Sequence, residues 1–172
     1  LVSGGHGSRI VTGWAEALHT DDTGTRKGRR DIVAGQTFVA LCCDVALPDG
    51  GADRLFEPLW WRSGRYIQLL IETGDQPLTL KRIGLQETRY PLEMESRFDS
   101  SDKRLDAVIP LALRSLQMCA HETYMDCPYY EQLMYVGDSR LEALTTYVIS
   151  ADDRLPRKSI LLFDASRVPD GF

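Results

Sequence analysis

Three acidic residues and two tyrosines stand close together in one short stretch of this 172-residue chain: Asp126, Tyr130, Glu131, Tyr135 and Asp138. Carboxylates bind sugar hydroxyls through charge-assisted hydrogen bonds, and aromatic rings pack on the apolar faces of a sugar ring. Glycosidic cleavage also needs a proton donor, which is usually a carboxylic acid. Acids clustered among rings therefore indicate carbohydrate chemistry. A solvated surface connection is the alternative, and composition alone favours that alternative.

Helical patterns on both sides make this stretch a connection between two helices. A Ser-Ser-Asp sequence at residues 100–102 is a helix-start signal, and apolar or small residues then recur at helical spacing over residues 105–120. Pro110 lies inside that pattern, which predicts either a kink there or the true start of the helix. Two more helices are expected at about residues 138–150 and 153–166. The Gly137-Asp138 pair suggests that Asp138 caps the first of them.

The chain up to residue 99 has the pattern of β-structure instead. Strands are expected at residues 9–18, 37–45, 65–72, 78–90 and 93–98. The third is apolar enough to be buried on both faces. Several short strands with turn residues between them predict an antiparallel sandwich. The fold class is therefore α+β, with a partial β-sandwich domain over residues 1–99 and a helical domain over residues 100–172.

Charge and composition exclude several function classes. The chain has 20 basic and 25 acidic residues, a net charge of −5, which argues against nucleic acid as a partner. No apolar run approaches the roughly 18 residues that span a bilayer, so no membrane association is expected. The four cysteines form neither a CxxC pair nor a Cys/His spacing, and no calcium-loop pattern is present. We therefore expect no metal and no cofactor.

The ordered string Asp-Cys-Pro-x-x-Glu-x-Leu-x-Tyr-x-Gly-Asp, at residues 126–138, resembles the signature of bacterial α-L-rhamnosidases of the six-hairpin class, glycoside hydrolase family 78. Further stretches resemble the β-sandwich of that family and the crossing into its (α/α)6 barrel: residues 14–18, 27–31, 56–61, 64–66 and 88–93. The resemblance implies that residues 100–172 form the first helices of such a barrel. It also implies a piece of a longer bacterial enzyme, cytoplasmic or periplasmic, which acts on a rhamnosyl glycan or glycoside.

The resemblance implies a role for each residue of the acidic stretch. Glu131 matches the general acid that protonates the leaving-group oxygen. Asp126 and Asp138 match acids that hydrogen-bond the rhamnose hydroxyls or support the general acid. Tyr135 stands where the family commonly has a tryptophan that lines the sugar subsite. Tyr130 is a second candidate for substrate contact, and for both tyrosines a packing role is the alternative.

The family inverts configuration with a second glutamate as base, and inversion requires the two carboxyl groups to lie roughly 6.5–9.5 Å apart. That base is expected beyond Phe172, so this chain is expected to be inactive alone. Two alternatives stay open. One is a non-catalytic carbohydrate-binding or structural module. The other is a six-hairpin glycosidase for a different sugar, because Tyr129 and Tyr130 replace an arginine that the family often has ahead of the acid.

Overall fold

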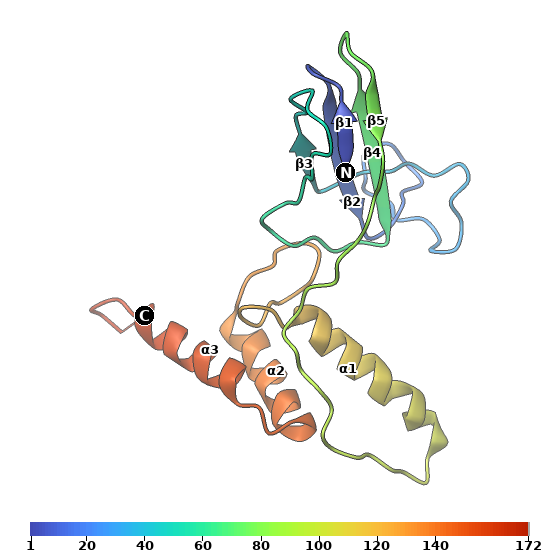
Figure 1. Ribbon diagram of the computed structural model, residues 1–172. Coiled ribbons are helices and arrows are strands. Elements are labelled where there is room, and N and C mark those ends of the chain that lie inside the picture. Colours follow the sequence, from blue (N-terminus) through green and yellow to red (C-terminus); the bar gives the residue numbers. More distant parts are fainter. Residues whose placement is uncertain (172) are drawn as a thin grey trace. The chain divides into compact units, whose positions relative to one another are not determined.

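Residues 1–171 are described by a computed structural model, in which the chain forms two compact units that meet between Gln86 and Glu87. The strands lie in the first unit and the helices in the second (Figure 1). This confirms the expected mixture of antiparallel sheets and helices. The division falls ahead of the boundary expected after residue 99, because the segment that follows Gln86 is bound to the helices.

Two antiparallel sheets make up the first unit. In the smaller one, β1 (Val2–Gly4) pairs with β5 (Leu78–Leu80). In the larger one, β2 (Arg9–Ala15) lies between β3 (Cys42–Ala46) and β4 (Tyr66–Glu72). The strands expected at residues 9–18, 37–45 and 65–72 thus form with shorter or shifted limits. Of the strand expected at residues 78–90, only the first three residues form one.

The expectation that β4 is buried on both faces is wrong. Ile67, Leu70 and Ile71 are 39%, 53% and 39% exposed. In the three-stranded sheet β4 is an edge strand, paired with β2 on one side only. An apolar run indicates that a strand favours burial. It does not indicate which other part of the protein covers the strand.

The strand expected at residues 93–98 does not form. These residues run without regular structure beside the helices, and the Glu95 and Ser96 N–H groups donate to the Ile149 carbonyl at 2.8 and 3.2 Å. The Tyr90 N–H similarly donates to the Ala120 carbonyl at 2.8 Å, and Leu92 is 1% exposed. The backbone of this segment therefore pairs with helix ends, so no sheet partner is needed.

The second unit contains a short 3₁₀ helix, Lys103–Ala107, and three α-helices: α1 (Val108–Cys119), α2 (Val136–Ile149) and α3 (Arg154–Ala165). The side chain of Asp102 caps the 3₁₀ helix by accepting a hydrogen bond from the Arg104 N–H at 3.1 Å. Pro110 is the third residue of α1, where its missing N–H costs little. It therefore marks the start of the helix and does not kink it.

The core of this unit joins the connecting segment, the helices and the loop after α1. Its buried members are Leu92, Leu116, Ala120, Tyr124, Ile149 and Leu155. Loop residues contribute to this core as well as helix residues, so the loop is held to the helices by apolar burial.

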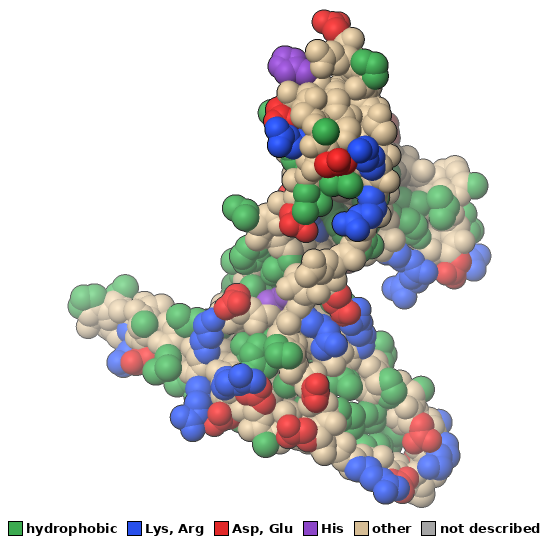
Figure 2. All heavy atoms as spheres, viewed as in Figure 1, with side chains coloured by type: hydrophobic (Ala, Val, Ile, Leu, Met, Phe, Trp, Pro, Cys, Tyr) green, Lys and Arg blue, Asp and Glu red, His purple; other side chains and the backbone are tan. Residues whose placement is uncertain are grey.

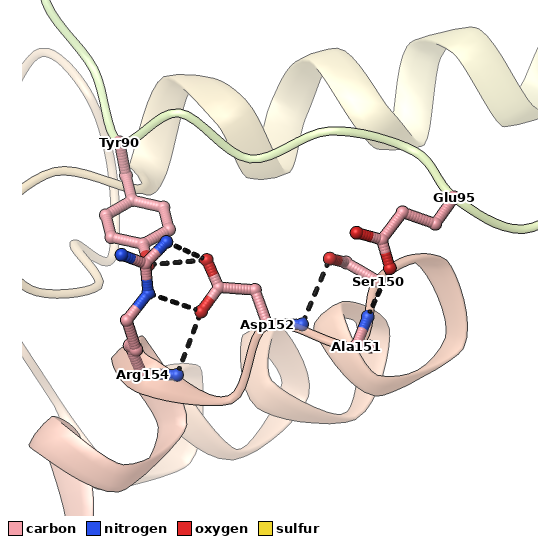
Figure 3. A network of polar contacts seen from close by, with 6 residues as sticks. All are labelled: Tyr90, Glu95, Ser150, Ala151, Asp152 and Arg154. Atoms are coloured by element: carbon pink, nitrogen blue, oxygen red, sulfur yellow. Dashed lines mark hydrogen bonds and ion pairs between the residues drawn. The ribbon is translucent and has the colours of Figure 1, made fainter.

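A polar network fixes the turn between α2 and α3 (Figure 3). The Asp152 carboxylate accepts hydrogen bonds from the Tyr90 hydroxyl at 2.7 Å and from Arg154 Nε at 2.8 Å. The Arg154 guanidinium, with Tyr90, holds the pKa of Asp152 well below its ordinary value. Beside it, the Ala151 N–H donates to Glu95 Oε2 at 2.8 Å. The network ties the connecting segment to the helix pair.

On the face seen in Figure 2, basic and acidic side chains alternate over the helical unit. Arg157 pairs with Asp153 at 2.6 Å, and Arg167 pairs with Asp164 at 2.7 Å. Of the helices over residues 1–171, none combines the length and the apolar character needed to cross a bilayer.

Candidate functional site

The loop between α1 and α2 is closed by Asp126. Its N–H donates to the Leu133 carbonyl at 2.8 Å, and the Leu133 N–H donates back to Asp126 Oδ1 at 3.0 Å. At the start of the loop, the Met125 N–H donates to the Cys119 carbonyl at 2.8 Å. These bonds fix the two ends of residues 126–133, so the acids within the loop have defined positions.

Tyr124 anchors the loop in the core. Its ring is fully buried, and its hydroxyl lies 2.6 Å from Thr146 Oγ1 on α2. Burial raises the pKa of Tyr124 to about 12. The loop is thus attached to α2 by both apolar contact and a buried hydrogen bond.

A tight turn presents Glu131. The Glu131 N–H donates to Cys127 Sγ at 3.2 Å, and the Gln132 side-chain amide donates to the Pro128 carbonyl at 3.0 Å. Gln132 has a φ of 54°, in the left-handed region that non-glycine residues adopt only at a cost of about 1 kcal/mol. Such strain persists only where surrounding bonds hold it, and here they hold the turn that carries Glu131.

The structure brings Asp126, Glu131 and Tyr135 together. The Glu131 side chain is hydrogen-bonded to Asp126 and accepts a hydrogen bond from the Tyr135 hydroxyl, which raises the pKa of Tyr135. Burial alone raises the pKa of Asp126, but hydrogen bonds from the Leu133 N–H, Cys127 and Glu131 outweigh it and hold that pKa below its ordinary value. Asp126 therefore favours its ionised form, and Glu131 is largely open to solvent.

Asp138 lies in the first turn of α2, but it is not the cap of that helix. The helix begins at Val136 with Tyr135 as its N-cap residue, which makes no side-chain capping bond. The expectation that Asp138 caps α2 is therefore wrong. Because the helix begins two residues earlier, its carboxylate still interacts favourably with the helix dipole and is free to face a neighbouring space.

That space is a pocket of about 350 Å³ between α1, α2 and the loop. Its lining residues are Ala112, Ser115, Leu116, Cys119, Asp126, Asp138, Leu141, Glu142 and Thr145. Two of the predicted acids, Asp126 and Asp138, line it directly. Glu131 and Tyr135 are linked to it through Asp126, whose charge also reaches Tyr135.

Glu142 is the acid that sequence reasoning missed. Burial, followed by the charges of Asp138 and Asp126, raises the pKa of Glu142 to about 8. The available signal was its spacing, because Glu142 follows Asp138 by four residues and so lies on the same face of α2. Glu142 lies within an amphipathic helix pattern, and an acidic residue in such a pattern is normally exposed to solvent.

Tyr130 lies apart from the pocket. It is 48% exposed and packs edge-to-face on the buried ring of Tyr129, with 4.8 Å between the ring centroids. Among residues 1–171, no group of three or more histidine, cysteine or acidic side chains is arranged to hold a metal ion. The carboxyl groups and tyrosine hydroxyls of the loop and the pocket are proton-transfer and hydrogen-bonding groups.

Comparison with known protein families finds one similarity. Residues 93–171 match the model of the bacterial alpha-L-rhamnosidase 6 hairpin glycosidase domain. This range contains the whole loop, the pocket and all the predicted site residues, whereas nearly all of the other resembling stretches lie ahead of it. Comparisons with curated proteins and with solved structures find no match. Residues 93–171 are thus similar to a six-hairpin glycosidase domain.

Proposed function

We propose that this chain carries the general-acid part of an inverting glycoside hydrolase of family 78 that cleaves terminal α-L-rhamnosides. Its main support is the similarity of residues 93–171 to the six-hairpin glycosidase domain. In this proposal the three α-helices belong to an (α/α)6 barrel over residues 100–172, and the sheets of residues 1–99 belong to a β-sandwich. The general base comes from outside residues 1–172, so the chain alone is inactive.

Glu131 is the proton donor in this mechanism. A hydrogen bond between two carboxyl groups requires a proton on one of them. The mechanism requires that proton on Glu131, next to Asp126, whose pKa its hydrogen bonds hold below the ordinary value. Glu131 is also exposed, so a glycosidic oxygen can reach it. Proton transfer to that oxygen leaves a negative charge on Glu131, which the Tyr135 hydroxyl stabilises by its hydrogen bond.

Asp126 and Asp138 hold the sugar. Both line the pocket and can accept hydrogen bonds from hydroxyl groups of a bound ring. The α1 wall of the pocket contributes the apolar side chains of Ala112 and Leu116, against which the C–H face and methyl group of a rhamnose ring can pack. Tyr135 is hydrogen-bonded to Glu131 and is a candidate contact to the sugar, and Tyr130 is the more distant one.

The test is the leaving-group dependence of Glu131→Gln in the full-length protein. With a phenyl α-L-rhamnoside, which needs protonation, we expect the rate to fall by about 10³-fold or more. With a dinitrophenyl rhamnoside, whose leaving group needs no proton, the loss should be less than about tenfold. Glu122→Gln is the matched control, because Glu122 lies nearby in the same loop with a side chain that is 92% exposed.

Equal losses on both substrates would contradict the acid role of Glu131. The anomeric form of the first product, read by proton NMR, tests inversion separately. A different six-hairpin glycosidase is favoured by one observation, the Tyr129–Tyr130 pair in place of the arginine expected ahead of the acid. Cleavage of another sugar in a panel of aryl glycosides, with none of the rhamnoside, would support that second candidate. A non-catalytic module would bind a sugar but cleave none of the panel.

A further inference from the structure

Glu142 occupies an unusual position in the pocket. It lies one helical turn after Asp138, and the two carboxyl groups line the same side of the space. Its Oε2 atom is closed off from solvent and has no hydrogen-bond partner within residues 1–171. A buried polar atom without a partner is costly, so its presence requires an explanation.

The surroundings disfavour a negative charge on Glu142. Asp126 and Asp138 line the same pocket, and none of the described residues that line it is basic. Burial of the side chain acts in the same direction, and together these causes raise its pKa to about 8. A carboxyl group in such a place is neutral near pH 7.

We propose that Glu142 acts as a neutral carboxylic acid that donates a hydrogen bond to an oxygen of the bound sugar, while Asp126 and Asp138 accept hydrogen bonds from the sugar's hydroxyl groups. This inference rests on the proposed glycosidase function. Carboxylates only accept hydrogen bonds, whereas each sugar hydroxyl both donates and accepts. Without Glu142, the acids of the pocket would offer a sugar no donor. The terminal torsion of a glutamate is soft, so its hydroxyl can turn toward the pocket.

We expect the affinity for the sugar to depend on pH through the ionisation of Glu142. Deprotonation converts the donor into a charged acceptor, and binding of the sugar weakens. The titratable groups that face Glu142 are Asp138 on the same helix, Asp126 and Tyr124 on the loop, and Cys119 on α1. Burial, with the charge of Glu142, raises the pKa of Cys119 to about 11, and that of Tyr124 is about 12. Neither of these two groups titrates between pH 7 and 9.

The experiment measures KM and kcat of the full-length protein with an aryl α-L-rhamnoside from pH 6 to 9.5. We expect the wild-type KM to rise above pH 8 by up to about tenfold per pH unit. The KM of Glu142→Gln should stay flat within about twofold, because an amide donates and does not ionise. Glu142→Leu, which lacks a donor, should have a KM raised about tenfold at every pH. Glu122→Gln is again the control.

An alkaline rise of KM that persists in Glu142→Gln would overturn the inference, as would a Glu142→Leu variant with the wild-type KM at pH 7. A second measurement needs no substrate: the δ-carbon resonance of Glu142, identified by its absence from Glu142→Gln, should titrate near pH 8. Titration near pH 8 without cleavage of any glycoside would overturn the proposed function and leave the neutral acid intact. Titration near pH 4.5 would overturn the neutral acid itself.

Discussion

The hydroxyl of Tyr124 lies 2.6 Å from Thr146 Oγ1, and both side chains are fully buried. Thr146 Oγ1 in turn donates to the Glu142 carbonyl at 2.9 Å. Tyr124 therefore donates to Thr146, and this relay connects the loop that bears Asp126 to the helix that bears Asp138 and Glu142. The loop and α2 keep their mutual geometry through one buried hydrogen-bond chain.

Tyr124→Phe should lower the free energy of unfolding by about 1–2 kcal/mol. The substitution keeps the ring and leaves the buried Thr146 oxygen without its donor, and an unsatisfied buried group costs this amount. Chemical denaturation measures the change. Tyr147→Phe is the control, because that ring is 54% exposed and its substitution should cost less than about 0.5 kcal/mol. Equal effects of the two changes would contradict a role for the buried bond.

Asp126 has two separable roles, closing the loop and accepting from the sugar. Asp126→Asn keeps an oxygen at the position of Oδ1, so the Leu133 N–H should stay protected from hydrogen exchange while KM for the sugar rises. Asp126→Ala removes the acceptor, and the Leu133 N–H should exchange at least about tenfold faster. Unchanged protection of Leu133 in the alanine variant would show that other bonds close the loop.

The helices were predictable because their signals are local. The cap at Asp102, the position of Pro110 and the apolar spacing of α1 lie within a few residues of one another. The mixed fold was predictable for the same reason. The start of α2 was expected two residues too late, because Asp138 lies in its first turn and does not cap it.

The strand expected at residues 93–98 does not form. Alternation of apolar and polar residues distinguishes the two faces of a strand, but it does not identify the neighbouring strand. Here the N–H groups of Glu95 and Ser96 donate to the Ile149 carbonyl.

The candidate site was predictable as a list of acids and not as a geometry. The motif at residues 126–138 supplied Asp126, Glu131, Asp138 and Tyr135, which the structure brings together. It could not supply Glu142, because that residue joins the pocket only when α2 packs beside α1 and buries its carboxyl. Burial depends on tertiary packing, and the sequence of one helix does not show which other elements pack on it.

Gly13 in the centre of β2 should not tolerate a side chain. A Cβ there would lie 3.1 Å from both Ala40 Cβ and Phe38 Cε1, which is closer than ordinary contact. Gly13→Ala should therefore lower stability by about 1–3 kcal/mol in thermal or chemical unfolding. Gly84→Ala is the control, since a Cβ there meets nothing within 4 Å. That change should be neutral or slightly stabilising. A stable Gly13→Ala protein would indicate that Phe38 moves aside.

Asp152→Asn should weaken the turn between α2 and α3 in a pH-dependent way. The folded pKa of Asp152 is lowered, so its contribution is present above the unfolded value of about 4 and is lost as the pH falls below it. We expect a loss of about 1 kcal/mol at pH 7, allowing for solvent screening, that shrinks toward zero near pH 2. Asp153→Asn, at a more exposed ion pair, is the control. A loss that does not change with pH would mean that the charge of Asp152 is unimportant.

Glu142→Gln should change stability in the opposite pH range. The folded pKa of Glu142 is raised to about 8, so the wild-type protein keeps its full stability below the unfolded value of about 4.5 and loses stability as the pH rises through 8. The amide cannot ionise, and the variant should not share that loss. Relative to wild type, the variant should therefore gain about 1–2 kcal/mol between pH 4.5 and 8.5, after discounting for partial exposure.

Melting temperatures of the two proteins, measured across this range, test the prediction. Glu122→Gln, whose carboxyl is exposed, should follow the wild type at every pH. Parallel curves for wild type and Glu142→Gln would mean that Glu142 is already ionised in the folded protein. A difference that grows from pH 4.5 and levels off above pH 8 would instead link stability to the proton through which we propose that Glu142 donates a hydrogen bond to the sugar.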